Sequence, residues 1–207
     1  QQISDAMRAF SEMSLSLCDK VIQNEKLVND YEIQIDLACT EFIARRQPTA
    51  RDLRLVMAIS KAITNLERAG DEAERVARRT KRLVEANIQS EINVAEIKLS
   101  GQMAISLLRR SLDAFARLDT MSAVLVVQED KQIDEEFRAF VRVLISYMME
   151  DPRTITAGLD MLSIAKAIER IGDHAKNIAE FVIYIAKGSD VRHVSQEDLV
   201  REASKSD

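Results

Sequence analysis

Apolar residues recur every three or four positions along most of the chain, which is the period of an α-helix that buries one face. One such stripe consists of Ile59, Ile63, Leu66, Ala73, Ala77, Thr80 and Val84. Another alternates steps of four and three, as in helices with coiled-coil-like packing: Ile164, Ile168, Ile171, Ala175, Ile178, Val182 and Ile185. Interruptions of the pattern predict six helices, separated by breaks at 11–14, 47–49, 86–93, 118–120 and 151–152.

Residue types at several of these breaks are typical of helix ends. Thr49 is the expected N-cap of the third helix, and Asp52 stands at capping-box spacing from it. Asp151 is expected to cap the sixth helix, with Pro152 at the first helical position. We expect that helix to end at Gly188, directly after a basic last turn.

Composition agrees with a helical protein that has a sizeable core. Of the 207 residues 46% are hydrophobic but only 4% aromatic, and just 5 Gly and 2 Pro interrupt the chain, so we predict an all-α fold with long helices. No apolar run approaches the roughly 18 residues of a membrane span, and we identify no signal peptide. The net charge of −5 argues against nucleic-acid binding. Cys18 and Cys39 lack metal-ligand spacing, which indicates buried, reduced thiols in a cytoplasmic protein.

The chain carries an internal duplication. Two near-copies of one motif lie 102 positions apart: Glu67-Arg68-Ala69-Gly70-Asp71-Glu72-Ala73 and Glu169-Arg170-Ile171-Gly172-Asp173-His174-Ala175. Weaker matches at an offset of 105 pair residues 9–10 with 114–115 and 25–29 with 130–134. We therefore predict two tandem three-helix bundles at 1–90 and 91–190 and a tail at 191–207. The first helix is much shorter than its counterpart at 93–118, so we expect the chain to begin inside it.

Each predicted bundle places two acidic or amide pairs on adjacent helices. Members of a pair stand four residues apart and so share a helix face, where like charges repel by roughly 0.2–0.5 kcal/mol. Helices joined by a short connection run antiparallel, so residues equidistant from the connection lie at one level. The connections at Pro48 and Asp151-Pro152 thereby align the first-bundle pairs and the second-bundle pairs: Glu25/Asn29 with Glu67/Asp71, and Asp130/Asp134 with Glu169/Asp173.

Converging oxygen ligands of this kind are what hard cations prefer. The pairs lie away from the apolar stripes, which favours a site on the bundle surface over a buried catalytic centre. A solvated, ion-paired helix face explains the same spacing, and Arg75 stands where it can neutralise Asp71. Because Asn29 replaces the acid found at Asp134, we expect the first-bundle site to be the weaker one.

Three further features have two interpretations each. Gly70 and Gly172 interrupt helices at a cost of roughly 0.5–1 kcal/mol, which indicates close helix packing or space for a ligand. His174 is expected at the surface or in packing. The basic stretch at 75–82 is a solvated helix face or a patch for an acidic partner.

The sequence resembles the PhoU family of phosphate-specific transport accessory proteins over essentially its whole length. The doubled E-R-x-G-D motif is the most specific part of the resemblance. The other matching segments are Ala44-Arg45-Arg46-Gln47-Pro48, Asp52-Leu53-Arg54, Tyr147-Met148-Met149-Glu150-Asp151-Pro152-Arg153 and Lys176-Asn177-Ile178-Ala179-Glu180.

The resemblance implies a cytoplasmic, non-enzymatic regulator of phosphate homeostasis, commonly a homodimer, that touches the membrane only through its partners. Those partners are the ATPase subunit of a phosphate ABC transporter and a PhoR-like sensor kinase, and the regulator keeps phosphate-starvation genes repressed. Some family members carry surface metal clusters on E/D-x-x-x-D pairs. Here these match Glu67/Asp71, Glu169/Asp173, Asp130/Asp134 and, less well, Glu25/Asn29, and would hold iron, zinc, manganese or magnesium that the fold does not require.

Two other functional classes fit the sequence less well. A di-iron carboxylate enzyme would need the buried Glu-x-x-His spacing of that class, which the helices lack. A membrane-deforming helical protein would need apolar stripes that remain uncovered, whereas these stripes are satisfied within each predicted bundle.

Overall fold

The computed structural model describes residues 1–86, 93–191, 194 and 196–204, and the described residues are helical with no strand. This confirms the all-α prediction. The elements in chain order are α1 (Gln2–Glu12), α2 (Leu15–Arg46), α3 (Ala50–Glu85), α4 (Ala95–Arg117), α5 (Thr120–Glu150), the 3₁₀ turn η1 (Pro152–Thr154), α6 (Ile155–Lys187) and α7 (Gln196–Ala203). No helix among the described residues is long and apolar enough to cross a membrane.

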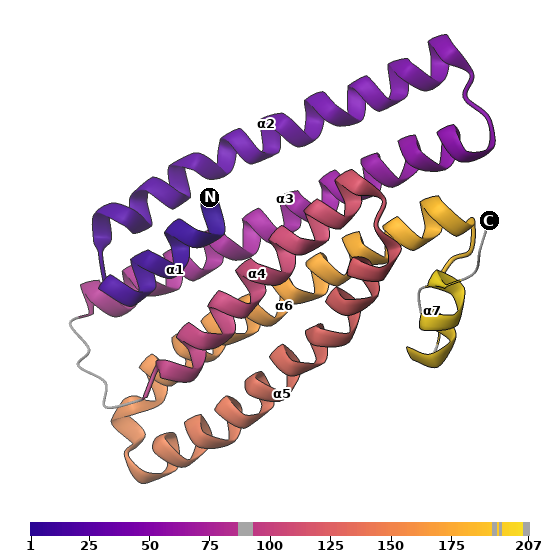
Figure 1. Cartoon of the computed structure of the whole chain (residues 1–207). Helices are drawn as coiled ribbons and strands as arrows, with labels where there is room; N and C mark the ends of the chain where they lie inside the picture. The colour runs from indigo at the N-terminus through magenta and orange to yellow at the C-terminus, as the bar shows by residue number, and fades with distance from the viewer. Residues whose placement is uncertain (87–92, 192–193, 195, 205–207) are drawn as a thin grey trace.

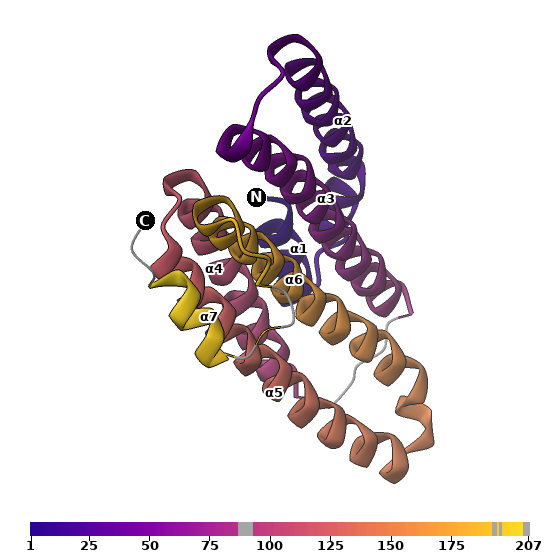
Figure 2. The ribbon, with the colours of Figure 1, turned by 90° about the vertical axis from the view of Figure 1, so that its right-hand side faces the viewer.

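Helices α1–α3 form one bundle and α4–α6 form a second, with α3 and α6 side by side between them (Figures 1 and 2). The predicted pair of tandem three-helix bundles is therefore confirmed. The predicted tail contains a seventh helix, α7, which packs on α5 and α6 (Figure 2). Its residues Leu199 and Ala203 are buried and belong to the same hydrophobic core as the bundle helices. The predicted boundary at residue 90 lies outside the described residues.

Helices α3 and α6 run antiparallel, because residue numbers fall along α6 as they rise along α3. The contacting pairs are Arg54 with Gly188, Lys61 with Phe181, Asn65 with Asn177, Glu72 with Arg170, and Arg79 with Asp160. The fourth pair joins the two copies of the repeated motif directly. The internal duplication thus brings its two motif copies to one level at the contact between the bundles.

The helix ends follow the predictions with one exception. Gly188 ends α6 in the left-handed conformation with φ 75°, and Asp151 accepts a hydrogen bond from the Arg153 backbone N–H at 3.0 Å. Asp151 caps the short turn η1, and α6 itself begins three residues later at Ile155. Thr49 occupies the N-cap position of α3, as predicted, but its side chain makes no capping hydrogen bond.

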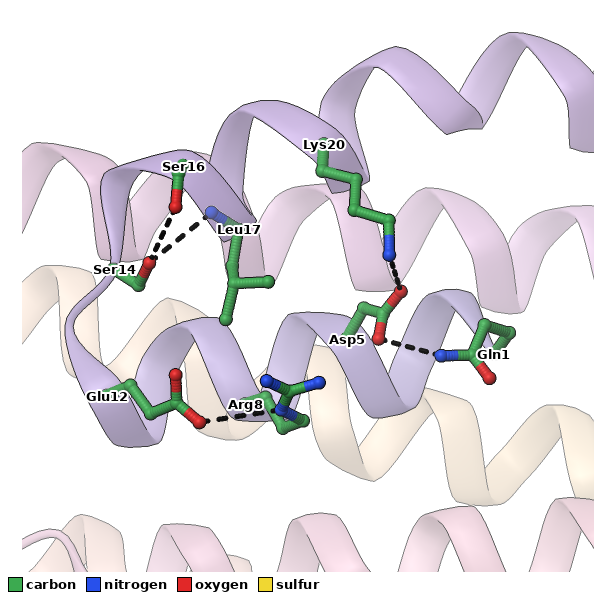
Figure 3. Close-up of polar contacts among 8 residues, drawn as sticks. All are labelled: Gln1, Asp5, Arg8, Glu12, Ser14, Ser16, Leu17 and Lys20. Carbon is green, nitrogen blue, oxygen red and sulfur yellow. Dashed lines mark hydrogen bonds and ion pairs between the residues drawn. The ribbon is translucent and has the colours of Figure 1, made fainter.

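Polar contacts hold α1 against α2 near the start of α1 and at the connection that follows its end (Figure 3). Ser14 caps α2 by accepting a hydrogen bond from the Leu17 backbone N–H at 3.4 Å. The buried carboxylate of Asp5 accepts hydrogen bonds from Lys20 at 3.0 Å and from Gln1 at 2.8 Å. The Lys20 hydrogen bond is the largest cause of the lowered pKa of Asp5. The charged carboxylate therefore stabilises the packing of α1 on α2.

The two bundles are covered unequally, since α1 has 11 residues and α4 has 23. Helices α2 and α3 extend well beyond α1 (Figure 1). At equivalent positions of the repeat, Phe140 and Leu144 on α5 are 2% and 0% exposed, whereas Ile35 and Cys39 on α2 are half-buried. Both cysteines are free, as predicted, but only Cys18 is buried, because α1 does not reach the level of Cys39.

Of the two interpretations of Gly70 and Gly172, the structure supports close helix packing. The side chains that lie against the two glycines differ. A Cβ added at Gly70 would meet Val28 Cγ1 at 3.1 Å, whereas one at Gly172 would meet Asp130 Oδ1 at 2.9 Å and Ile133 Cδ1 at 3.1 Å. Gly172 therefore makes room for a buried carboxylate.

We predict that Gly172→Ala lowers the melting temperature while Gly70→Ala leaves it unchanged or raises it. Alanine favours the helix by roughly 0.5–1 kcal/mol at both positions, but only at Gly172 must a buried acid move. Thermal unfolding followed by circular dichroism at 222 nm, the standard helix band, measures both variants. Equal shifts for the two variants would contradict the packing explanation.

Candidate metal centre

The first bundle gathers three carboxylates at the level where the sequence places them. The connection at 47–49 folds α3 back along α2, and ligand oxygens of Glu25, Glu67 and Asp71 all lie within 4.8 Å of one another. This is the one such group of three or more potential ligands among the described residues. Glu25 and Glu67 are partly buried and Asp71 is exposed, so the cluster opens to the surface.

Asn29 completes this cluster. Its Nδ2 donates a hydrogen bond to Glu25 Oε2 at 2.9 Å, while Glu25 Oε1 and Asn29 Oδ1 are buried with no hydrogen-bond partner among the described residues. Burial raises the pKa of Glu25, with a smaller contribution from Asp71, and Asn29 opposes the shift. Burial likewise raises the pKa of Glu67, and the negative charge of Asp71 adds to it. The cluster itself contains no basic side chain, although Arg68 opposes the rise in the pKa of Glu67, and two of its oxygen atoms have no donor.

These residues fit a hard divalent cation. Carboxylate and amide oxygens are ligands of magnesium, manganese and calcium, and a cation would satisfy the two buried oxygen atoms that lack partners. It would also offset the repulsion between the carboxylates, which adds to the effect of burial on the pKa of Glu25 and of Glu67. The cluster contains no histidine or thiolate, which are the ligands that favour zinc.

The equivalent residues of the second bundle are arranged differently. Asp130 is 2% exposed and lies against Gly172, with Lys176 Nζ 3.6 Å from its Oδ2. Glu169 accepts a hydrogen bond from Lys166 at 2.6 Å. Burial raises the pKa of Asp173, and the charges of Glu169 and Asp134 raise it further, so the four carboxylates do lie near one another. Lys166 and Lys176 thus pair with Glu169 and Asp130, although the second carboxylate oxygen of Glu169 is buried without a hydrogen-bond partner.

The structure corrects two expectations and bears on a third. The first-bundle cluster has the closer set of carboxylates, whereas Asn29 suggested the weaker metal site there; which cluster binds metal more tightly stays a prediction. Asp130 is buried rather than outward-facing, because the absence of a Cβ at Gly172 lets α5 and α6 approach closely. Arg75 pairs with Glu72 at 3.1 Å and leaves Asp71 to the acidic cluster. Sequence spacing predicts the height of each side chain along the bundle, but it does not predict which basic side chain pairs with each acid.

We predict that Asp130→Asn stabilises the protein at pH 7.5 but not at pH 4. Burial raises the pKa of Asp130 to about 6, although Lys176 opposes the shift. A raised acid pKa means that the folded state prefers the protonated form, so stability is fully present below about pH 4 and is lost as the pH rises through about 6. Asparagine avoids this loss, by about 1–3 kcal/mol at pH 7.5.

Urea unfolding in chelator-treated buffer at the two pH values measures the effect. The matched control is Asp134→Asn, which removes the same charge from a half-buried side chain one turn further along α5. A gain for Asp130→Asn that is the same at both pH values would disprove the titration as its cause.

The contact between α3 and α6 contains two buried acids that sequence analysis missed. Glu72 is 5% exposed and accepts a hydrogen bond from Arg170 at 3.0 Å, and Asp160 is 4% exposed and accepts one from Arg79 at 3.0 Å. Glu72 stands at helical spacing between Ala69 and Val76, both buried. Ala69 and Val76 thus mark a second buried face of α3, on which Glu72 contacts α6. This spacing could have predicted from the sequence that Glu72 is buried.

His174 lies at the same contact, half-buried, with its Nδ1 3.1 Å from Asn65 Oδ1. Burial lowers its pKa to about 4, and the positive charges of Arg68 and Arg170 lower it further. The imidazole is therefore neutral at physiological pH and packs between the bundles, as one of the two sequence interpretations had it.

The repeated motif and the two-bundle fold have counterparts among known proteins. The PhoU domain family matches this sequence over residues 1–80 and 97–182, which include both motif copies. The chain belongs to the PhoU family. The resemblance seen in the sequence is thereby confirmed.

Several PhoU proteins are similar over almost the whole chain. A "Phosphate-specific transport system accessory protein PhoU homolog" of Burkholderia sp is 54% identical over 203 residues, 98% of this chain and 86% of the relative. The "Phosphate-specific transport system accessory protein PhoU" of Escherichia coli (strain K12) is 46% identical over 199 residues, 96% of this chain and 82% of the relative.

Solved PhoU structures agree with the fold. The crystal structure of PhoU from Pseudomonas aeruginosa superposes with a TM-score of 0.88 at 42% identity, covering 91% of this chain and 90% of that one. The crystal structure of the phosphate transport system regulatory protein PhoU from Streptococcus pneumoniae gives a TM-score of 0.83 at 28% identity, covering 92% and 88%. PhoU proteins are thus described as accessory or regulatory proteins.

Proposed function

We propose that this chain is a cytoplasmic negative regulator of phosphate-starvation signalling that also restrains phosphate import. It acts as an adaptor between the ATPase subunit of a phosphate ABC transporter and a PhoR-like sensor kinase. The observation that carries the proposal is the similarity, over 96–98% of the chain, to proteins described as accessory to phosphate-specific transport. The doubled E-R-x-G-D motif and the two-bundle fold belong to the same family.

The decisive experiment deletes the gene and follows a phosphatase reporter in cells grown with abundant phosphate. Loss of the regulator should switch the reporter on, because the kinase is no longer held in its repressing state. Expression of the wild-type chain from a plasmid should restore repression. Reporter activity that stays low after deletion would show that the chain does not regulate this response.

Direct association is tested separately with an affinity-tagged chain. We expect the transporter ATPase subunit and the sensor kinase to co-purify with it from cells grown in high phosphate. A tagged protein of unrelated helical fold is the control for adhesion to the column. Recovery of neither partner would leave the regulator without its proposed adaptor role.

We further infer that the cluster of Glu25, Glu67 and Asp71, with Asn29, holds a divalent cation on the first bundle. The proximity of the three carboxylates and the two buried oxygen atoms without partners support this inference. Metal binding by Asp130, Asp134, Glu169 and Asp173 stays a prediction of the helical spacing and of the family resemblance. A di-iron enzyme is not favoured, because the first-bundle cluster contains no histidine.

A further inference from the structure

Four arginines follow one face of α3 toward its C-terminal end. Arg75, Arg78, Arg79 and Arg82 stand at positions i, i+3, i+4 and i+7, which share a helix face. Together with Asp71 and Glu74 they line a surface groove of about 520 Å³. This volume lies in the range of sites that hold small molecules, roughly 300–1,000 Å³. All the side chains that line the groove are charged.

Buried Asp160 on α6 holds two of these arginines in place. Its Oδ1 lies 3.0 Å from Arg79 Nη1 and its Oδ2 lies 3.6 Å from Arg82 Nε. The carboxylate is 4% exposed, whereas the Arg82 side chain is 59% exposed. One buried negative charge is thus shared by two guanidinium groups whose outer parts face solvent.

Buried Glu72 has the same arrangement with a second arginine pair. Its Oε2 lies 3.1 Å from Arg75 Nη1 and its Oε1 lies 3.0 Å from Arg170 Nη1. Arg170 comes from the other motif copy, on α6. Again one carboxylate fixes the position of two guanidinium groups while neutralising only one of them.

Donors remain for a ligand after these contacts are counted. A guanidinium has five N–H donors, and each of these ion pairs uses a single nitrogen of its arginine. Arg78 contacts Glu74 on its own helix through Nη2 and is 59% exposed. The lining of the groove holds four arginines against two acids, Asp71 and Glu74, and is therefore positive on a chain whose net charge is −5.

The arginine face is not a product of the duplication. The equivalent positions of the second repeat, 102 residues later, carry Asn177, Glu180, Phe181 and Tyr184. Joining the two bundles does not require the whole face either, because Arg78 is paired within α3. The duplication therefore does not explain the arginine face, and the contact between the bundles accounts for only part of it.

We propose that this groove binds a small anion that carries several linked phosphate groups. Guanidinium groups recognise phosphate oxygens through paired N–H donors, and buried carboxylates that fix the guanidinium planes reduce the entropy lost on binding. The face spans about 10 Å along α3, at 1.5 Å per residue, so one phosphate cannot contact all four arginines. An acidic protein segment fits less well, since the groove offers no apolar or aromatic anchor for an interface.

Isothermal titration with sodium tripolyphosphate in metal-free buffer at about 50 mM salt tests the proposal, with inorganic phosphate as the single-phosphate comparison. The informative variant is Arg78→Gln with Arg82→Gln, and the matched control is Arg45→Gln with Arg117→Gln. The control removes the same charge from exposed arginines that, like Arg78, pair within their own helices. We expect tripolyphosphate to bind the wild type more tightly than phosphate does.

Binding should weaken about tenfold or more in the groove variant, stay unchanged in the control, and fall at 0.5 M salt because the ions are screened. If the double variant unfolds, the single change Arg78→Gln provides the test. Arg78 pairs with Glu74 on its own helix, so its replacement breaks no ion pair between helices. No tripolyphosphate binding, or equal weakening in the control, would overturn the proposal. So would a poly-glutamate peptide that binds the groove as tightly, which would assign it to an acidic protein segment.

Discussion

Replacing Ile168 with alanine is expected to lower the free energy of unfolding by about 2–5 kcal/mol. The equivalent change in the first repeat, Leu66→Ala, should cost only about 1–2 kcal/mol. Ile168 is 1% exposed on α6, which packs on both α4 and α5, whereas Leu66 on α3 is half-buried. The difference follows from the length of the helix that covers each site, since Gln2, where α1 begins, corresponds to Leu107 in the middle of α4.

Urea unfolding followed by circular dichroism at equal protein concentration compares the two variants. Ile168→Val is the graded control and should cost about 0.5–1.5 kcal/mol, because it removes one methyl group without a large cavity. Equal losses for Ile168→Ala and Leu66→Ala would mean that another segment or molecule covers Leu66 in solution.

Manganese or magnesium at a hundredfold excess over its Kd is expected to stabilise the folded protein by about 2.7 kcal/mol. For a chain of this size the gain corresponds to a rise in Tm of about 5–10 °C. The double change Glu67→Gln with Asp71→Asn should abolish the rise. It removes two of the three carboxylates whose oxygens lie within 4.8 Å of one another and keeps the side-chain shapes.

The duplication supplies a matched control for this experiment. Glu169→Gln with Asp173→Asn makes the same chemical change at the equivalent place in the second repeat. We expect it to leave most of the rise in Tm intact, because Lys166 and Lys176 already pair with two of the four carboxylates of that cluster. A rise that survives the first-bundle change and disappears with the second-bundle change would assign the metal to Asp130 and its neighbours instead.

Local sequence signals predicted the elements well where one residue type determines backbone geometry. Gly188 adopts the left-handed conformation that ends α6, and Asp151 caps the turn that precedes it. Thr49 has an ideal spacing to Asp52 yet makes no capping hydrogen bond, because the chain enters α3 through Ala50 at φ 47°. A cap depends on the approach direction of the preceding residues, which local sequence does not determine.

The candidate metal centre shows where sequence reasoning stops. Spacing on two antiparallel helices placed Glu25 beside Asp71, and the structure brings them together. The same reasoning treated Asp130 as equivalent to Glu25, although one is buried under Gly172 and the other lies at the edge of an open cluster. Relative burial and the reach of neighbouring lysines arise from inter-helix distance, which depends on residues on both helices.

The sequence by itself determined the helical class, the two-bundle duplication and the family, because hydrophobic period and repeated motifs are properties of the chain order. Only the tertiary structure decided which acids are free and which are neutralised. It placed the two motif copies against each other across α3 and α6, joined Arg170 to Glu72, and arranged four arginines around one groove. Such pairings join residues about a hundred positions apart, and the packing of the two bundles, rather than any local pattern, brings them within reach.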